Sequence, residues 1–177
     1  MRYLIVVDMQ LDFISGALGS EEARAIVPRV LDKVRTFDGQ VIFTKDTHEE
    51  DYLTTREGRR LPVPHCIRGT EGHELCKELR PYATHVIEKP TFGSVALVQR
   101  LAGQTETVDY IELCGLCTDI CVISNAMLLK AAFPEADVAV DAACSAGVTP
   151  LSHRTALDAM RAVQIDVVND MPHTTIR

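Results

Sequence analysis

The run Tyr3-Leu4-Ile5-Val6-Val7-Asp8 decides the fold of this chain. The residues before Asp8 are all apolar and lack the alternation of a half-exposed strand. Such a run is typical of a strand buried on both faces, which is the usual state of strands in parallel sheets. Because parallel strands need long crossovers, we expect helices to connect this strand to its neighbours.

The rest of the chain repeats this pattern, since short apolar runs alternate with longer amphipathic segments. Beyond Tyr3–Val7, strands are predicted at Gln40–Thr44, Thr84–Glu88, Val108–Leu113, Val138–Val140 and Ile165–Val168. Strands that alternate with helices indicate an α/β protein. We therefore predict a three-layer, doubly wound fold, with a six-stranded, mainly parallel sheet and helices on both faces.

Helix signals lie between these strands. Ser20-Glu21-Glu22 offers an N-cap and an acidic first turn to a helix that ends near Phe37. Further helices are predicted from Ser94 to Leu101, from Thr118 or Asp119 as the N-cap through Ala131, and from Thr149-Pro150 to Val163. In the last of these, proline suits the first helical position.

The chain has 177 residues, enough for one buried core, and we expect a single domain over residues 1–177. Thr54–Gly72, rich in charge, proline and glycine, is interpreted as a long functional loop. A net charge of −7 argues against non-specific nucleic-acid binding. The apolar run after Met1-Arg2 is too short for a signal peptide or a membrane span, so we expect a cytoplasmic protein without a membrane partner.

Reactive side chains follow four of the predicted strands. Asp8 follows the first, Asp46 and His48 follow the second, Lys89 follows the third, and Gly115–Cys121 follows the fourth. In a doubly wound sheet the carboxyl ends of the strands share one edge, where ligands bind. We therefore expect these segments to form one site.

Cys121 is a candidate nucleophile. If Thr118 or Asp119 caps the helix, its first turn contains Cys121, and the unpaired backbone N–H groups there favour a thiolate and an oxyanion. The alternative is that Cys121 is simply a small buried residue, as cysteines often are. Without a signal peptide the cysteines are expected to be reduced, and Cys114-x-x-Cys117 lacks the second ligand pair of a structural zinc site. Cys76, Cys114, Cys117 and Cys144 are therefore interpreted as packing residues.

Asp46, His48, Glu57 and His65 are candidate metal ligands. Two carboxylates and two imidazoles suit zinc, manganese or iron(II). The alternative is that His48 and Glu57 are surface loop residues and His65 packs against prolines. His73, His85, His153 and His173 have no evident companions and are interpreted as surface or core residues.

Taken together, these residues resemble the isochorismatase-like hydrolases, over the chain from Tyr3 to Asn169. Gly115-Leu116-Cys117-Thr118-Asp119-Ile120-Cys121-Val122 is similar to the family segment G-x-x-T-D-x-C-V, which ends with the nucleophilic cysteine and a valine. Val7-Asp8-Met9-Gln10-x-Asp12-Phe13 resembles the opening segment of the family, and Glu88-Lys89 stands in the place of its lysine.

The resemblance implies a catalytic triad of Asp8, Lys89 and Cys121. It implies an oxyanion hole from the backbone N–H groups of Cys117 and Cys121, and a cis peptide at Leu116–Cys117, which is rare without proline. Substrate contacts are expected from Phe13, Phe92 and Leu116.

Within this family, nicotinamidases bind a metal through D-x-H and a later P-x-H-C-x-x-G-T-x-G. Lys45-Asp46-Thr47-His48 and Pro62-Val63-Pro64-His65-Cys66-Ile67-Arg68-Gly69-Thr70-Glu71-Gly72 match these patterns. Some members add a glutamate ligand, for which Glu57 is suitably placed. The resemblance thus implies a divalent metal ion held by Asp46, His48, Glu57 and His65, with zinc preferred and manganese or iron(II) as alternatives.

The implied function is that of a nicotinamidase, which converts nicotinamide to nicotinate and ammonia through a cysteine thioester. A first alternative keeps the cysteine triad and acts on another small amide or carbamoyl compound. A further alternative is a non-catalytic, redox-responsive thiol module. We expect a small-molecule substrate and, from the habit of the family, a homo-oligomer.

Overall fold

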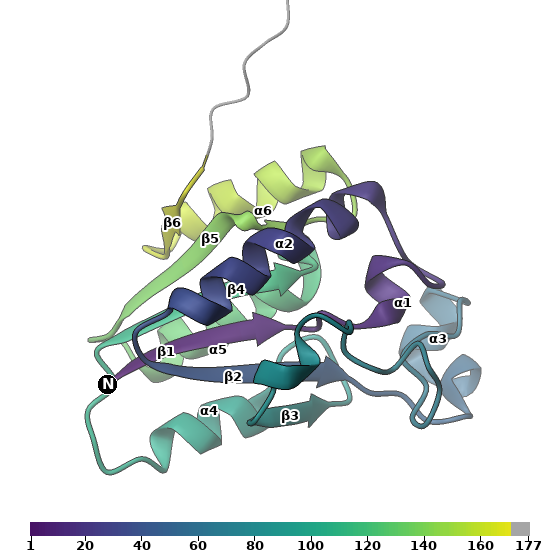
Figure 1. The fold of residues 1–177 in the computed structure, drawn as a ribbon, viewed down its shortest axis with the longest axis horizontal. Helices are drawn as coiled ribbons and strands as arrows, with labels where there is room; N and C mark the ends of the chain where they lie inside the picture. Colours follow the sequence, from purple (N-terminus) through teal and green to yellow (C-terminus); the bar gives the residue numbers. More distant parts are fainter. Residues whose placement is uncertain (171–177) are drawn as a thin grey trace, which may run out of the picture.

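A six-stranded sheet forms the centre of the computed structural model, which describes residues 1–170 (Figure 1). Its strands are β1 (Arg2–Val7), β2 (Gln40–Asp46), β3 (Val86–Lys89), β4 (Tyr110–Leu116), β5 (Asp137–Ala146) and β6 (Asp166–Val168). They lie in the order β3-β2-β1-β4-β5-β6. The predicted doubly wound sheet is confirmed, and every pair of neighbouring strands is parallel.

Strand β1 is central because its side chains alternate between two cores. Tyr3, Ile5 and Val7 pack into the core on one face. Leu4 and Val6 pack into the core on the other face. A strand that buries both faces has no place for a polar side chain, which explains why the run before Asp8 is uninterrupted.

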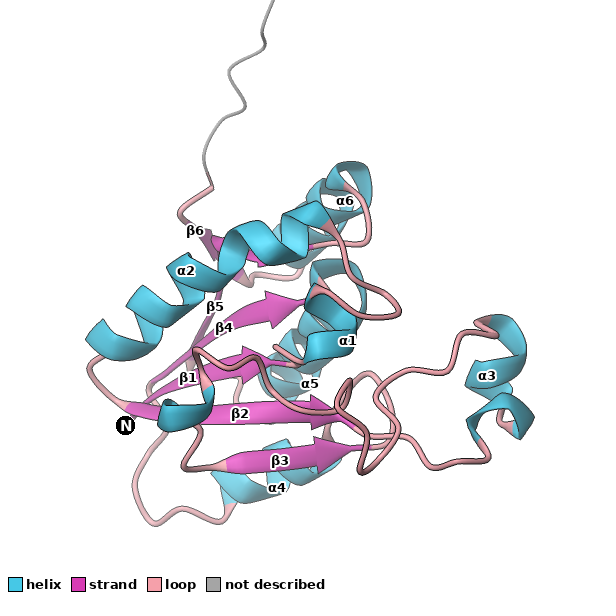
Figure 2. Cartoon of the chain, turned by 45° about the vertical axis from the view of Figure 1, so that its right-hand side comes forward, coloured by secondary structure: helices cyan, strands magenta, loops and turns pink. Residues whose placement is uncertain are grey.

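The helices form the two outer layers (Figure 2). Helices α1 (Leu11–Ile14) and α2 (Glu21–Thr36) cover one face. Helices α4 (Val95–Ala102), α5 (Ile123–Ala132) and α6 (Pro150–Ala162) cover the other. The predicted caps of α2 and α6 are confirmed, since Ser20 accepts from the N–H of Ala23 and Thr149 forms a capping box with Ser152. No helix within residues 1–170 is both long and apolar enough to cross a membrane.

The segment after β4 differs from the prediction. The strand continues to Leu116, whereas the sequence pattern ended it at Leu113 and began a turn at Gly115. A π-helical turn, η3 (Thr118–Val122), then leads into α5, and neither element has a side-chain cap. The predicted cap by Thr118 or Asp119 is wrong because both side chains have other partners. Thr118 bonds to His153, and Asp119 accepts from the N–H of Val148.

The long loop contains more regular structure than expected. The predicted loop Thr54–Gly72 contains α3 (Arg56–Arg60); η1 (Tyr52–Thr54) ends where the loop begins, and η2 (Arg80–Tyr82) follows it. Figure 2 shows α3 beyond the carboxyl ends of β2 and β3, and this helix contains Glu57. The loop therefore brings a carboxylate to the edge of the sheet where the other candidate residues end. Of the remaining histidines, His173 lies outside the described residues.

Candidate active site

Four candidate catalytic and metal-binding residues meet at the carboxyl edge of the sheet. Asp8 directly follows β1, and Cys121 lies in η3 after β4. Asp46 and Lys89 are the last residues of β2 and β3, where they stand opposite each other in the sheet. Both were predicted to follow their strands. The strands run one or two residues further, and their final side chains enter the site.

Lys89 is the centre of the catalytic cluster. Its Nζ lies 2.6 Å from Oδ2 of Asp8, 3.1 Å from Oδ1 of Asp46 and 3.4 Å from Sγ of Cys121. All four residues are buried, and the most exposed of them, Cys121, has only 4% of its surface accessible. A buried ammonium ion is stable only when carboxylates compensate its charge, and Asp8 and Asp46 supply two.

A threonine that the sequence did not single out orients Asp8. The Thr44 hydroxyl donates to Oδ1 of Asp8 at 2.6 Å, which leaves Oδ2 toward Lys89. Asp8 itself has a φ of 48°, a left-handed conformation that aspartate tolerates better than most residues. The signal in the sequence was a polar residue at the end of the predicted strand Gln40–Thr44.

Burial controls the protonation of the catalytic cluster. It raises the pKa of Asp8, and the charge of Asp46 adds to this effect while Lys89 opposes it. Burial also raises the pKa of the Cys121 thiol well above its usual value, and the charge of Asp8 raises it further. The resting residue is therefore a thiol. A neighbouring base would be needed to remove the proton, and a thiolate favoured by the helix start stays a prediction.

The turn that carries Cys121 is held close to β1. Gly115 has a φ of 115°, and a Cβ there would overlap the carbonyl oxygen of Val7. The predicted cis peptide at Leu116–Cys117 is confirmed. The Cys117 carbonyl accepts from the N–H groups of Ile120 and Val122 at 3.0 and 3.1 Å, which closes the π turn. That the backbone N–H groups of Cys117 and Cys121 form an oxyanion hole stays a prediction.

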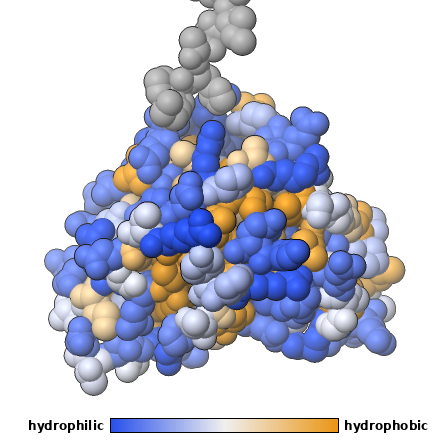
Figure 3. Space-filling view, in the orientation of Figure 1, coloured by the Kyte–Doolittle hydropathy of each residue, from blue (hydrophilic) through white to orange (hydrophobic). Residues whose placement is uncertain are grey.

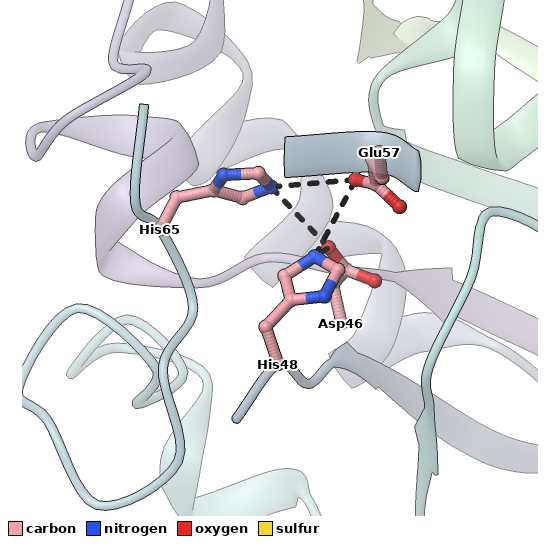
Figure 4. Close-up of side chains that lie close together, drawn as sticks. All are labelled: Asp46, His48, Glu57 and His65. Atoms are coloured by element: carbon pink, nitrogen blue, oxygen red, sulfur yellow. Dashed lines mark ion pairs between the residues drawn. The ribbon is translucent and has the colours of Figure 1, made fainter. Parts of the chain in front are cut away.

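The four candidate metal ligands also come together (Figure 4). The His48 Nε2 atom lies 3.0 Å from Oδ2 of Asp46 and 3.5 Å from Oε1 of Glu57. His65 Nε2 lies 3.6 and 3.9 Å from the same two oxygens. One ion with bonds of about 2.1 Å to each ligand would hold ligand atoms roughly 3.0 to 3.5 Å apart. The two separations of His48 lie in this range, and those of His65 exceed it by 0.1 to 0.4 Å, so a small shift of His65 would bring all four ligands to one ion.

The hydrogen bonds of the two histidines also fit a metal. Nδ1 of His65 lies 2.8 Å from the carbonyl of Val63, so Nε2 can offer its lone pair to the cluster. Nε2 of His48 is buried and, although Oδ2 of Asp46 lies 3.0 Å away, it makes no hydrogen bond of good geometry with the described residues. A buried ring nitrogen without a partner is costly in a protein interior. An ion at the centre of the four ligands would satisfy it.

Aromatic rings surround this cluster. Tyr52 lies with its ring centroid 4.6 Å from that of His48 and 5.0 Å from that of His65. Its hydroxyl donates to the carbonyl of Leu61 at 2.9 Å. Phe13 lies 5.5 Å from His65 on another side. Tyr52 was not predicted to belong to the site. The one indication in the sequence is that it is an aromatic residue in a polar loop shortly after His48.

The predicted substrate contacts are distributed differently. Phe13 is beside the metal ligands, and Leu116 is buried at the end of β4, before the cysteine turn. Phe92 is 41% exposed and lines a surface hollow with Met127 and Leu128 of α5. Its carbonyl accepts from the side chain of Asn125, which also donates to the Cys121 carbonyl. Contact of Phe92 with a substrate stays a prediction.

The comparisons with known proteins agree with this arrangement. The family model described as the isochorismatase domain matches residues 2–169, so the chain belongs to the isochorismatase family. The chain is 31% identical over 141 residues to the uncharacterized isochorismatase family protein PncA of Bacillus subtilis, an alignment covering 71% of this chain and 76% of that protein.

Solved structures give more specific relatives. The pyrazinamidase of Pyrococcus horikoshii in complex with zinc is 29% identical, with a TM-score of 0.79 over 94% of this chain and 98% of that one. The nicotinamidase/pyrazinamidase PncA of Bacillus subtilis is also 29% identical, with a TM-score of 0.80 and the same coverage. The pyrazinamidase/nicotinamidase of Streptococcus mutans is 25% identical, with a TM-score of 0.81 over 95% of this chain and all of that one.

Proposed function

We propose that this protein is a nicotinamidase, which hydrolyses nicotinamide to nicotinate and ammonia. The observation that carries the proposal is the position of Asp46, which contacts Lys89 through one oxygen and both histidines through the other. A cysteine nucleophile and a metal centre thus share one residue. The similarity to solved pyrazinamidases and nicotinamidases, one of them with zinc, supports the same substrate class.

The chemical steps follow from the buried cluster. Asp8 accepts the thiol proton of Cys121, and the ammonium group of Lys89 stabilises the negative charge during this transfer. The thiolate attacks the carboxamide carbon, and the N–H groups of Cys117 and Cys121 hold the oxyanion. Asp8 returns the proton to the departing nitrogen, so ammonia leaves and a thioester remains. Asp8 then takes a proton from water, which attacks the thioester and releases nicotinate.

Asp46, His48, Glu57 and His65 would hold the metal ion, for which zinc is the first choice. When bound, the ion would coordinate the ring nitrogen of the substrate and orient the ring. Phe13 packs beside this place and offers an aromatic wall. Positioning of this kind makes the attack on the carboxamide effectively intramolecular.

The assembly and setting of the protein belong to the same proposal. We expect residues 1–177 to act as a single domain, in the cytoplasm, as a homo-oligomer. Figure 3 shows hydrophobic residues among polar ones in the middle of one face of the protein. Light scattering of the purified protein measures the oligomeric state directly.

The test of the activity is ammonia release from nicotinamide and from benzamide, which has the same carboxamide but lacks the ring nitrogen. The zinc-loaded protein should hydrolyse nicotinamide much faster than benzamide. Removal of zinc should abolish this preference, and Cys121→Ala should abolish both activities. A folded, zinc-loaded protein that leaves nicotinamide intact would contradict the proposal and favour another small amide or carbamoyl substrate.

A further inference from the structure

Asp12 ties the first turn of α1 to the loop that carries His65. Its Oδ2 accepts a hydrogen bond from the backbone N–H of Cys66 at 2.7 Å. Its own N–H donates to the carbonyl of Gly72 at 3.0 Å. Asp12, which lies shortly after the proposed general base Asp8, thus holds both ends of the loop from residue 66 to residue 72.

Cys66 connects two of the candidate metal ligands. It directly follows His65, and its carbonyl accepts the backbone N–H of His48 at 3.0 Å. Its φ of 47° is left-handed, a conformation that a residue with a side chain keeps only when its surroundings hold it there. The bond from Asp12 is one such restraint. Loss of this bond would release the Cys66 peptide, which joins His65 to the backbone of His48.

Gly72 shows how closely the loop fits around Asp12. A Cβ on Gly72 would overlap the Asp12 carboxylate, and its φ lies outside the left-handed region. Glycine is therefore required here for space and not for its backbone conformation. The neighbouring Phe13 packs on the His65 ring, so α1 contacts the ligand loop through both backbone and side chain.

From these contacts we propose that Asp12 is a positioning residue of the metal centre. It touches neither the ion nor the substrate. It holds the Cys66 peptide so that His48 and His65 are already placed when the ion arrives, which reduces the ordering that binding requires. The proposal rests on the metal centre of the proposed function. A purely structural role would instead stabilise the fold equally with and without zinc.

The first experiment measures the zinc dissociation constant by competition with a chromophoric chelator, and the Tm of the zinc-free protein. Asp12→Ala should raise the zinc Kd about tenfold or more, as loss of outer contacts does in other sites. Asp12→Asn keeps an oxygen for the Cys66 N–H and should recover most of the affinity. Asp38→Ala, an exposed aspartate before β2, is the matched control. A Kd unchanged in Asp12→Ala would overturn the proposal.

The second experiment is a double-mutant cycle with Gly72→Ala. Alone, Gly72→Ala should displace the carboxylate and weaken zinc binding to a similar extent. In the Asp12→Ala background it should add little, because the carboxylate that it clashes with is gone. Additive effects would show that the two residues act separately and would overturn the proposal. If Asp12→Ala does not fold, the Kd of Gly72→Ala decides the question alone.

These measurements separate the inference from the function on which it rests, since no substrate is present. Zinc binding that depends on Asp12, in a protein inactive on nicotinamide, would contradict only the proposed substrate. An active nicotinamidase whose zinc affinity ignores Asp12 and Gly72 would contradict only the positioning role.

Discussion

Thr118 and His153 are joined by a hydrogen bond of 2.7 Å between Oγ1 and Nδ1, which connects the turn holding Cys121 to helix α6. Nearby, the Asp119 carboxylate accepts the N–H of Val148 at 3.0 Å. Gly147 packs so closely against His153 that a Cβ would overlap its backbone. The nucleophile is therefore anchored from the last helix of the described chain, and the prediction that His153 has no companion is wrong.

This anchor predicts a loss of activity in Thr118→Val. Valine has nearly the shape of threonine, so the buried site stays filled while the bond to His153 is lost. A small displacement of Cys121 should lower kcat by about tenfold to a hundredfold. Thr155→Val, which removes a hydroxyl from the exposed side of α6, is the control. Equal kcat values in the two variants would show that the anchor does not position Cys121.

Asp8→Asn should nearly abolish turnover because an amide cannot accept the Cys121 proton. We expect kcat to fall by roughly 10² to 10⁴, the usual contribution of a general base. Zinc content and KM should change little. The kcat, the KM and the zinc content are measured on the same preparation. A variant with normal kcat would remove Asp8 from the mechanism.

A second buried charge cluster, remote from the proposed chemistry, predicts how stability varies with pH. Lys33 of α2 pairs with Glu112 of β4 and with Asp141 of β5. Burial raises the pKa of Asp141, but the hydrogen bonds from Lys33 and Asn169 and the charge of Lys33 together outweigh burial and lower that pKa. Burial opposes a charged lysine, yet bonds to Asp141 and Glu112 raise the pKa of Lys33.

The direction in which stability changes with pH follows from the difference between the folded and unfolded pKa values. The lowered pKa of Asp141 gives stability that is present above about pH 4 and lost as the pH falls through the folded value. The raised pKa of Lys33 gives stability that is present below about pH 10 and lost at still higher pH. Urea unfolding from pH 2 to pH 7 should show the acid limb. Asp141→Asn should flatten it, and an unchanged slope would contradict the assignment.

Lys33→Met tests the same cluster at constant pH. It leaves two buried carboxylates without their cation, so it should lower the free energy of unfolding by about 3 to 5 kcal/mol at neutral pH. Asp141→Asn leaves Lys33 paired with Glu112 and should be milder. If Lys33→Met lowered the free energy of unfolding less than Asp141→Asn does, the ion pairs of Lys33 would not be contacts that stabilise α2 against the sheet.

Gly115→Ala should be severely destabilising. The new methyl group would overlap the Val7 carbonyl, and the φ of 115° is unfavourable for any side chain. We expect a loss of 3 kcal/mol or more, measured by urea unfolding. Gly103→Ala, at the end of α4, meets its nearest atom at 3.3 Å and should be almost neutral. Comparable losses in both variants would contradict the proposed fit between β1 and β4.

Local signals in the sequence predicted the parts of this structure that depend on local physics. Each such signal lies within a few residues of the element that it defines, as do the caps at Ser20 and Thr149 and the apolar run of β1. The π turn has no comparable signal, because its conformation depends on His153 and Val148, which lie far along the chain. The predicted ends of β2, β3, β4 and β5 were too early, whereas those of β1 and β6 were correct.

The candidate site shows the same division. Motif spacing identified Asp8, Asp46, Lys89 and Cys121, which the structure brings into contact. The residues that support them, such as Thr44 and Tyr52, act through contacts between segments far apart in sequence. A spacing pattern does not contain that information. Phe92 was predicted to contact the substrate because it follows Lys89, and in the structure it lines the surface hollow beside α5.

The central position of β1 has a consequence for synthesis on the ribosome. Strand β1 is made before both of its neighbours: it pairs on one side with β2, but its other neighbour is β4, so Arg2 pairs only once Tyr110 has been made, and Val7 only after Gly115. Until then the nascent chain presents an unpaired strand edge, apolar from Tyr3 to Val7, which favours aggregation. Since Asp8 and Cys121 come from these two segments, the catalytic pair forms only after about two-thirds of the 177 residues have been translated. We expect nascent chains shorter than this to depend on chaperones.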